Sequence, residues 1–508
     1  MIDKIKKINF YVLDDEICGS DFSTSWYKEA IAEDTLWGDW FNKDRPFSYF
    51  YSYIHWADLL DVNYEIKNIR DEVDDRESNW IILNLKGRVS VENISNFIIE
   101  KKMLSFIHKN ENVKLMIFLP QEGMSIQDQP FWYVTFCEKN NIPLERLYIL
   151  QSAFWDFNNP TVLEFLNKDI PKKRNTDKVG KINWIINKFS TIFFWTLLFH
   201  TYSVNQYVPS DNLRYKKRNK YFTFLNVALT YGGDPPHVKL FRLYPLSKFH
   251  ADGILSKGYY SLISRVNDGW RFDVDNAKFT KHMVLGKWKE KFQKIEESIL
   301  DQSAIKQPLS LERKSALLRS FGSQIPDNIF KSDVLKSAKK LLDLVPIYLP
   351  SEDDKEYLKK FISVLHPIGV ESGDFMYMIP KMEIEDSYFS VVTESGYEGT
   401  LLYSTEKSGK ALLQLQPFIL ISTVGHLRGL QDMGFETFPE LFDESYDEIV
   451  DNFERIEFIC NEIKRVCNMS IEELHEIYVR IFPKLLRNRK QFFSYNLKEI
   501  FESWFVQR

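Results

Sequence analysis

A stretch in the last third of the chain combines carboxylates, lysines and a predicted helix start. Glu394 ends an apolar run, and Glu406 and Lys407 belong to the first turn of a helix expected to begin near Thr405. Carboxylates accept hydrogen bonds from hydroxyl groups, whereas the free N–H groups of a helix N-terminus attract phosphate. Lys410, one turn further on, adds a second positive charge. These residue types in this order predict a site for a sugar hydroxyl and a phosphate.

The elements around these residues follow the pattern of a βαβ unit. The apolar, β-branched run 388–393 predicts a buried strand, and Ser404 or Thr405 is a suitable N-cap for the helix that follows. Pro417 must end that helix, and the apolar run 418–421 predicts the next strand. Because ligands of such units bind beyond the carboxyl ends of the strands, we expect the carboxylate and the helix start to share one edge of a sheet.

Composition indicates a folded, globular protein without a strongly charged surface. The 508 residues are enough for two or three domains, and 44% hydrophobic with 27% charged residues is typical of globular chains. The net charge of −5 argues against nucleic acid as a bulk partner. The local basic runs 216–218 and 487–490 are interpreted as solvated faces.

The N-terminal residues and the cysteines favour a cytoplasmic protein. The first residues lack the apolar core of a signal peptide, and four scattered cysteines suit reduced thiols better than disulfides or a zinc site. The most apolar run, 192–199, is far shorter than the roughly 20 residues that a membrane span needs. We therefore expect no transmembrane segment.

Alternating strand and helix patterns predict two α/β halves, each with a mainly parallel sheet. The apolar runs of the first half are 8–13, 79–85, 113–119 and 146–151, and its helical patterns are 92–108 and 130–139. The second half has a strand at 220–227, a helix at 237–244, a strand at 259–264 and a helical tail from 443, whereas 287–340 has no assigned topology. We expect Rossmann-like domains at 1–215 and 216–485, and a tail at 486–508 that can pack back on the first.

One run of residues is similar to a motif of the α1,3-fucosyltransferase-like glycosyltransferases. Phe389 and four further residues precede Glu394-Ser395; the segment 404–407 (Ser-Thr-Glu-Lys) follows, and a helix leads into 416–418 (Gln-Pro-Phe). In that family a Phe-x-x-x-x-Glu-Asn segment precedes a Val-Thr-Glu-Lys segment and a Pro-Val strand. The order and the spacing of the acidic and basic residues therefore match the family pattern.

Further segments resemble fucosyltransferase-related proteins of phages, large viruses and bacteria. The sequences 434–438 (Gly-Phe-Glu-Thr-Phe) and 443–447 (Asp-Glu-Ser-Tyr-Asp) match the segments that continue the motif in those proteins. Their Phe-x-x-x-Asn strand and the His-Arg pair that follows it are matched in part at 222–226 and 237–238. The resemblance covers roughly residues 220–495 and is specific between 388 and 447.

This resemblance implies a GT-B architecture, in which two Rossmann-like domains face a central cleft. It further implies inverting transfer from a nucleotide-sugar donor, with GDP-fucose as one candidate, to a hydroxyl on a glycan, a protein or a modified nucleic acid. The donor would bind the C-terminal domain, and neither a metal nor another cofactor is expected. The sequence leaves the donor sugar, the acceptor and the oligomeric state open.

The chain departs from the family pattern at two positions of the matched region. Ser395 stands where fucosyltransferases have Asn, and Val238 stands where Arg is common, so that Arg242 or Arg265 would have to contact phosphate. The residues that the resemblance and the local chemistry assign to the donor are Asn226, His237, Arg242, Glu394, Ser395, Thr405, Glu406, Lys407 and Lys410. Strand-end capping and ordinary helix-start polarity remain as alternatives for several of them.

An inverting transfer also needs a base that deprotonates the acceptor hydroxyl. We expect it in the first domain, where Glu122 follows a predicted strand and is the first candidate, ahead of Asp14 and Asp15. A solvated loop carboxylate is the competing interpretation of each. The triplet 273–275 (Asp-Val-Asp) matches a metal motif of other glycosyltransferases, but such triplets are common by chance.

Two other functions remain open. The departures at Ser395 and Val238 would suit a non-catalytic protein that binds a glycan or a protein partner on a degenerate transferase fold. A nucleotide-dependent hydrolase or epimerase with the same two-domain layout is a weaker alternative. A P-loop is excluded, because Ala411 stands where that motif requires Ser or Thr.

Overall fold

The chain forms two compact units in a computed structural model. Unit 1 comprises Met1–Thr191, Lys278–Lys289 and Tyr495–Arg508, and unit 2 comprises Ile192–Ala277 and Glu290–Ser494. Each contains a parallel sheet with helices, which confirms the predicted α/β class with Rossmann-like units. The structure describes residues 7–12, 57, 60–83, 98–99, 101–119, 129–151, 178, 181–185, 197, 209–226, 230–231, 237–262, 311–326, 332–344, 381–394, 396–397 and 404–505.

Unit 1 contains a six-stranded parallel sheet in the order β2-β1-β3-β4-β5-β6. Its strands are β1 (Ile8–Val12), β2 (Tyr64–Asn68), β3 (Ser78–Leu83), β4 (Val113–Leu119), β5 (Leu147–Gln151) and β6 (Asn183–Ile185). Its described helices are α5 (Lys101–Lys109), α6 (Gln129–Lys139), the 3-10 turn η1 (Leu144–Arg146) and α20 (Leu497–Ser503). Strands β1, β3, β4 and β5 confirm the four predicted strands of the first half, whereas β2 and β6 were not predicted.

The residues that follow α20 pack on the sheet of unit 1. The ring of Phe505 lies 5.3 Å from that of Phe10 on β1 and 5.5 Å from that of Trp80 on β3, both edge-on. Ser78 Oγ donates a hydrogen bond of 2.6 Å to the Phe505 carbonyl. The end of the described chain thus completes part of the apolar core of unit 1.

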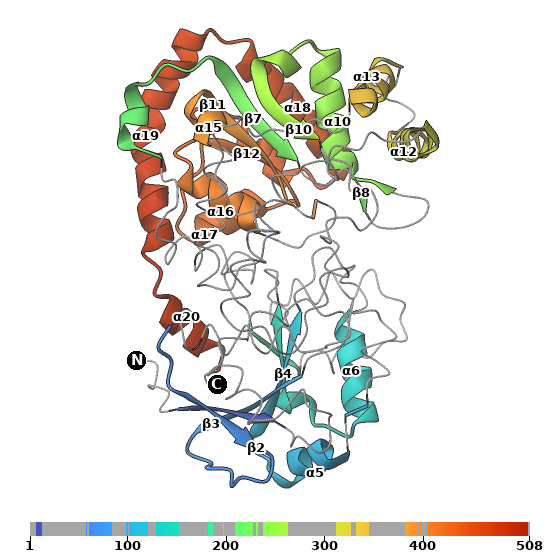
Figure 1. Ribbon diagram of the computed structural model, residues 1–508, viewed down its shortest axis with the longest axis vertical. Helices are drawn as coiled ribbons and strands as arrows, with labels where there is room; N and C mark the ends of the chain where they lie inside the picture. The colour runs from blue at the N-terminus through green and yellow to red at the C-terminus, as the bar shows by residue number, and fades with distance from the viewer. Residues whose placement is uncertain are drawn as a thin grey trace, which may run out of the picture. The chain divides into compact units, whose positions relative to one another are not determined.

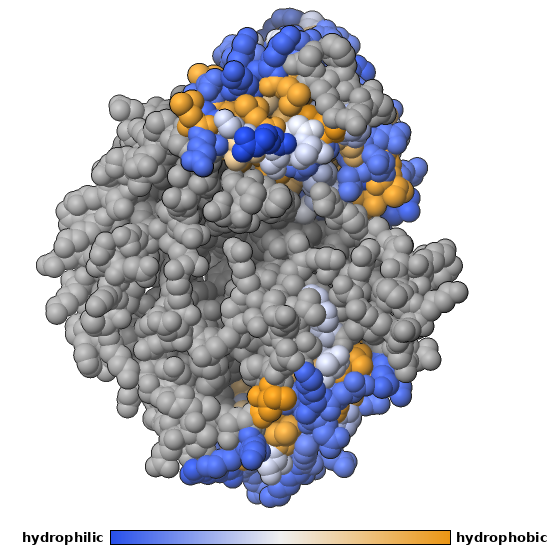
Figure 2. Space-filling model, turned by 90° about the vertical axis from the view of Figure 1, so that its right-hand side faces the viewer, coloured by the Kyte–Doolittle hydropathy of each residue, from blue (hydrophilic) through white to orange (hydrophobic). Residues whose placement is uncertain are grey.

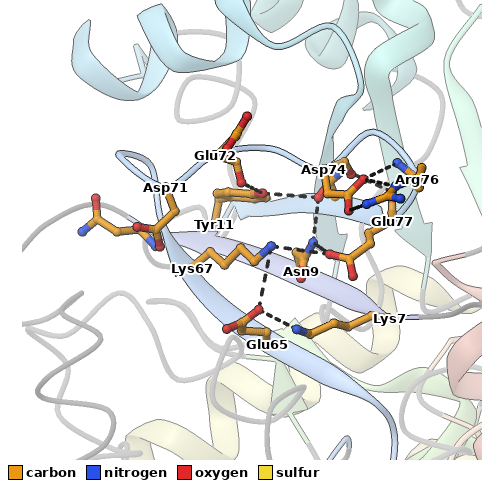
Figure 3. A network of polar contacts seen from close by, with 12 residues as sticks. Lys7, Asn9, Tyr11, Glu65, Lys67, Asp71, Glu72, Asp74, Arg76 and Glu77 are labelled. Carbon is orange, nitrogen blue, oxygen red and sulfur yellow. Dashed lines mark hydrogen bonds and ion pairs between the residues drawn. The ribbon is translucent and has the colours of Figure 1, made fainter.

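A network of polar side chains joins β1, β2 and the segment before β3 (Figure 3). Asn9 Nδ2 donates to Glu77 Oε2 over 2.7 Å and to Asn79 Oδ1 over 2.9 Å. Lys67 pairs with Glu77 at 3.4 Å and with Glu65 at 3.8 Å. Asn9 is fully buried and bonds to Asn79 on β3, and Glu77, which it also contacts, pairs with Lys67 on β2.

Unit 2 contains a four-stranded parallel sheet in the order β10-β7-β11-β12. Its strands are β7 (Lys220–Asn226), β10 (Gly258–Leu262), β11 (Ser387–Thr393) and β12 (Phe418–Ile421), and a separate antiparallel pair is formed by β8 (Thr230–Tyr231) and β9 (His237–Val238). Its described helices are η2 (Asp211–Tyr215), α10 (Leu240–Ala251), η3 (Leu255–Lys257), α12 (Leu311–Gln324), α13 (Ser332–Leu344), α15 (Lys381–Glu385), α16 (Glu406–Leu413), α17 (His426–Asp432), η6 (Glu444–Glu448), α18 (Asn452–Cys467) and α19 (Ile471–Phe493). Helix α10 packs against α18 and α16 against α19, so helices surround the sheet (Figure 1).

The segment β11–α16–β12 is the predicted βαβ unit. Every residue of β11 and β12 is buried, as expected for strands covered on both faces. Thr405 is the N-cap of α16, and its hydroxyl accepts from the Lys407 N–H over 3.3 Å. Parallel pairing of Thr393 with Ile421 brings the carboxyl ends of both strands to one edge of the sheet.

The described surface carries hydrophilic side chains and some exposed apolar ones. Figure 2 shows hydrophilic residues over most of the described parts of one face, with smaller hydrophobic groups among them. Individual apolar side chains such as Leu311 and Leu344 are exposed, at 81% and 61%. None of the helices in the described ranges has both the length and the apolar composition that a membrane crossing requires.

Candidate functional site

The sheet of unit 2 reverses its strand order between β7 and β11. Counted along the chain, its strands lie in the order second, first, third, fourth. Doubly wound sheets bind ligands at such a switch point, outside the carboxyl ends of the strands. Asn226 ends β7, Glu394 follows β11, and Thr393 Oγ1 donates to Asn226 Oδ1 over 2.7 Å. Two of the predicted site residues therefore occupy adjacent strand ends at the switch point.

Asn226 is held from both neighbouring strands and presents an amide donor. Its backbone N–H donates to Ser261 Oγ on β10 over 2.9 Å, and the same hydroxyl donates back to the Asn226 carbonyl over 3.1 Å. Thr393 on β11 fixes the side-chain oxygen. Within the part of the chain that the structure describes, Asn226 Nδ2 is buried without a hydrogen-bond partner. A buried donor in this state costs free energy, which a ligand oxygen would recover.

Glu394 is an intramolecular ligand of the α16 N-terminus. The residue is fully buried, and one carboxylate oxygen accepts from the backbone N–H groups of Thr405 (3.1 Å) and Ser408 (3.2 Å), as well as from the Ser408 hydroxyl. The other oxygen accepts from the Thr405 hydroxyl at 2.5 Å. The helix dipole stabilises a carboxylate in this position. Two N–H groups that the sequence suggested for phosphate are therefore already bonded to Glu394.

Glu406 and Lys407 form an ion pair in the first turn of α16. Lys407 Nζ lies 2.5 Å from Glu406 Oε1. Burial raises the pKa of Glu406, but the charge and hydrogen bond of Lys407, together with the charge of Lys410, outweigh burial, and the net pKa is lowered. Glu406 is therefore ionised at neutral pH. Its other oxygen, Oε2, is buried and has no hydrogen-bond partner among the described residues, so it can accept from a ligand hydroxyl.

Lys410 lies one turn further along α16. Burial lowers the pKa of its ammonium group to about 8, and repulsion by Lys407 acts in the same direction. The negative charges of Glu406 and Glu394 raise the pKa and so oppose this shift. Most of the group is still protonated at neutral pH. It can therefore supply positive charge to a phosphate, and this charge diminishes as the pH rises through about 8.

His426 is a buried polar residue of this region that the sequence analysis missed. Its Nε2 lies 2.8 Å from Ser404 Oγ, and both residues are buried. Burial lowers the pKa of His426 to about 4, although the charge of Asp447 acts in the opposite direction. The ring is therefore neutral, and its Nδ1 has no partner within the described ranges. The sequence signal for this residue is an apolar run followed by Gly425 and then His426. In the structure Gly425 has a left-handed φ of 77° and His426 begins α17.

Two further predicted residues lie on the connection that follows β7. Arg242 is in the first turn of α10 and is buried, with its guanidinium carbon 5.5 Å from the Phe241 ring centroid. His237 does not begin a helix, so the prediction of a helix at 237–244 was wrong at its start. It lies in β9, whose pairing with β8 keeps the backbone extended, and α10 begins at Leu240.

Several residues named from the sequence lie outside the described residues. Among them are Ser395 of the donor set, the base candidates Glu122, Asp14 and Asp15, and the triplet 273–275. The catalytic base therefore stays a prediction.

A surface pocket of about 410 Å³ lies elsewhere in unit 2, beside α18. Four carboxylates line it, those of Glu440, Asp443, Glu444 and Glu462, together with Arg465. The Arg465 guanidinium already bonds to Glu462 at 2.6 Å. The excess of negative charge makes this pocket unsuitable for a phosphate ligand.

The described part of the chain shows no cluster of three or more His, Cys, Asp or Glu residues that could hold a metal ion. The described cysteines Cys137, Cys460 and Cys467 are free and buried. Burial raises the pKa of Cys137 and of Cys467 to about 12, so both are protonated thiols rather than nucleophiles.

The chain matches no known protein-family model, and its sequence has no significant match among curated proteins. The similarity to fucosyltransferases therefore rests on the quoted motifs.

Proposed function

We propose that the protein is an inverting glycosyltransferase of GT-B architecture, which moves a sugar from a nucleotide-sugar donor to a hydroxyl of a glycan, a protein or a modified nucleic acid. Two features support this proposal besides the motif around Glu394. Both units are Rossmann-like, and buried polar groups lie at or after the carboxyl ends of three strands of unit 2. The buried polar groups are the main support for the proposal.

Buried polar atoms follow three strands of unit 2. Asn226 Nδ2 lies at the end of β7, Glu406 Oε2 at the start of the helix after β11, and His426 Nδ1 at the start of the helix after β12. Each lacks a hydrogen-bond partner within the described residues. A hydroxyl group can accept from the amide and donate to the carboxylate. Sugar and ribose rings carry several hydroxyls, so a nucleotide sugar fits this set of groups.

The reaction assigns a role to the lysines of α16. The acceptor oxygen bonds to the anomeric carbon while its proton passes to a carboxylate base, for which Glu122 remains the candidate. The bond from the sugar to the diphosphate breaks, and its electron pair stays on the diphosphate. Lys407 and Lys410 would stabilise that developing negative charge.

A thermal-shift panel tests donor binding. GDP, UDP, ADP and their sugar conjugates are added separately to the full chain, with a characterised glycosyltransferase as the positive control. We expect one nucleotide family to raise the melting temperature. If none does while the control enzyme responds, the proposal is wrong.

Matched variants test the site. Asn226→Ala and Lys410→Met each remove one polar contact, which corresponds to about 1–2 kcal/mol and a roughly 5- to 30-fold weaker Kd for the nucleotide sugar. Glu448→Ala is the control, because the Glu448 side chain is 79% exposed on the surface. Equal affinities for all three variants would argue against a donor site at the switch point.

A non-catalytic binding protein is the second candidate. The observation that favours it is the capping role of Glu394, which accepts four hydrogen bonds from Thr405 and Ser408 and so has less capacity for a ligand. A binder would retain affinity for the nucleotide or glycan without turnover. Release of free sugar from the donor without an acceptor would instead point to a hydrolase.

A further inference from the structure

One arginine of the basic run 216–218 is buried at the amino ends of the unit 2 strands. Arg218 stands just before β7 and is 2% exposed, whereas the two preceding lysines are exposed. Its guanidinium carbon lies 3.9 Å from the ring centroid of Tyr478 on α19 and 5.2 Å from that of Tyr388 on β11. The sequence suggested a solvated face for the whole run. Burial of this charge therefore needs a physical explanation.

Hydrogen bonds satisfy only part of the Arg218 guanidinium. Nη2 donates to the Tyr478 hydroxyl over 2.7 Å and more weakly to the Leu213 carbonyl at 3.4 Å. Nε and Nη1 are buried without a partner among the described residues. The buried Arg455 differs, because its Nε, Nη1 and Nη2 all donate to backbone carbonyls. Stacking on two tyrosines favours the cation but leaves two of its nitrogens unbonded.

Residues of two adjacent elements, α19 and η2, add further unbonded nitrogens. The ring of His475 on α19 lies 5.9 Å from that of Tyr388, and its Nδ1 is buried without a partner in the described part of the chain. The same holds for Nε of Arg214 in η2. Burial and the charges of Arg218 and Lys217 lower the pKa of His475. Helix α19 contacts η2, so these groups come from adjacent elements.

We propose that these residues bind a small oxyanion of the phosphate or sulfate class. We call Arg214, Lys217, Arg218 and His475 the Arg218 cluster. Its unbonded guanidinium nitrogens are donors, so the missing partner must accept hydrogen bonds, and the positive charge around them favours an anion.

The nearby carboxylates do not supply this partner. Asp386 accepts from Asn219 and from Tyr259, each over 2.8 Å. Glu472 and Glu476 of α19 are exposed. A bound anion would link the segment before β7 to α19 and so stabilise unit 2.

The Arg218 cluster is independent of the proposed donor site. Amino ends of parallel strands meet at one edge of a sheet and carboxyl ends at the other. Arg218 precedes β7 and Tyr388 lies at the start of β11, whereas Asn226 is the last residue of β7 and Glu394 follows β11. Loss of anion binding would therefore leave the glycosyltransferase proposal intact, and the reverse also holds.

The test is thermal unfolding of the full chain at constant ionic strength in sodium phosphate, sulfate or chloride. A specific site predicts that phosphate, sulfate or both raise the melting temperature above that in chloride, with a dependence on the logarithm of anion concentration. Phosphate binding is then measured by equilibrium dialysis of Lys410→Met, which lacks the α16 lysine, and one site per chain is expected. If the three salts act alike, a water molecule or the tyrosine rings alone accommodate Arg218, and the proposal fails.

Variants locate the effect. Arg218→Met keeps an unbranched side chain without the charge and should abolish the anion response, whereas Arg489→Met, which removes a guanidinium paired with Asp211, should keep it. If Arg218→Met does not fold, His475→Gln and Lys217→Met should each weaken anion affinity several-fold. Inorganic phosphate could also bind at α16, and Lys410→Met separates the two sites. If the anion binds at the Arg218 cluster, Lys410→Met keeps the response. A response lost in Lys410→Met and retained in the cluster variants would overturn the proposal.

Discussion

Replacement of Glu394 by alanine should destabilise unit 2 by about 3–5 kcal/mol. The carboxylate accepts four hydrogen bonds, from the N–H and hydroxyl groups of Thr405 and Ser408. A hydrogen bond to a charged group contributes about 1.5–3 kcal/mol, and a buried donor left unpaired costs about 1–3 kcal/mol. The two hydroxyls can rotate toward other acceptors, whereas the two backbone N–H groups cannot. The two backbone N–H groups therefore account for most of the expected loss of about 3–5 kcal/mol.

Two matched variants separate the hydrogen bonds from the charge and from general effects. Glu394→Gln keeps an oxygen that can accept from both N–H groups, and its amide NH₂ can donate to the Thr405 hydroxyl oxygen. We expect a loss of about 1–2 kcal/mol, mainly from the charge–dipole interaction. Glu448→Ala removes an exposed carboxylate 3.8 Å from Arg428 and should change stability by less than about 0.5 kcal/mol.

The assay combines urea unfolding with hydrogen exchange. Because two units need not unfold together, a single transition midpoint is ambiguous, whereas amide exchange in α16 reports the local free energy. Protection of the N–H groups of Thr405 and Ser408 should fall sharply in Glu394→Ala and only modestly in Glu394→Gln. A Glu394→Ala variant within about 0.5 kcal/mol of the wild type, with unchanged protection, would contradict this role of the carboxylate.

Three other predictions concern unit 2. Between about pH 8 and 10.5 the wild type should gain stability relative to Lys410→Met. The folded state loses the Lys410 proton near pH 8, whereas the unfolded state retains it up to 10.5. Urea titrations at both ends of this range measure the stability difference between the two proteins, and an equal difference at both ends would mean that the Lys410 pKa is unperturbed. Gly258→Ala would place a Cβ 2.3 Å from a ring atom of Phe222 and should cost about 1–3 kcal/mol in urea unfolding. Gly396→Ala is the neutral control, because its Cβ would meet none of the described residues within 4 Å. Arg455→Met removes donors to four backbone carbonyls and should lower stability by about 3 kcal/mol, so a melting temperature equal to that of the wild type would contradict the observed bonding.

The fold was predictable where local signals are strong. The run before Glu394, the N-cap at Thr405 and the stop at Pro417 each act over a few residues, and together they defined β11–α16–β12. Strand β2 was missed because its five residues include Glu65 and Lys67, which pair with other charged side chains at the sheet edge instead of entering the core. The start of α10 was misplaced because the pairing of β9 with β8 is not encoded in the helix sequence itself.

The candidate site was predictable in position but not in its bonding. Residue types placed Asn226 and Glu394 at strand ends, and the observed sheet order makes those ends neighbours. The contact of His426 with Ser404 spans 22 residues and depends on how two helices begin side by side. No local pattern carries that information. Likewise, the sequence could not indicate that Glu394 would bond to the helix start that it precedes by 11 residues.

This bonding changes where a phosphate can bind. At the α16 N-terminus it would lie beside a buried carboxylate that already accepts from the same N–H groups. Two like charges 4 Å apart repel by about 4 kcal/mol at an effective dielectric constant of 20, which exceeds the roughly 0.3–2 kcal/mol that a helix N-terminus contributes to binding an anion. If the protein is the proposed glycosyltransferase, the side chains of α16 would then have to hold the diphosphate. Lys407 is already paired with Glu406, so nucleotide affinity should depend most strongly on Lys410.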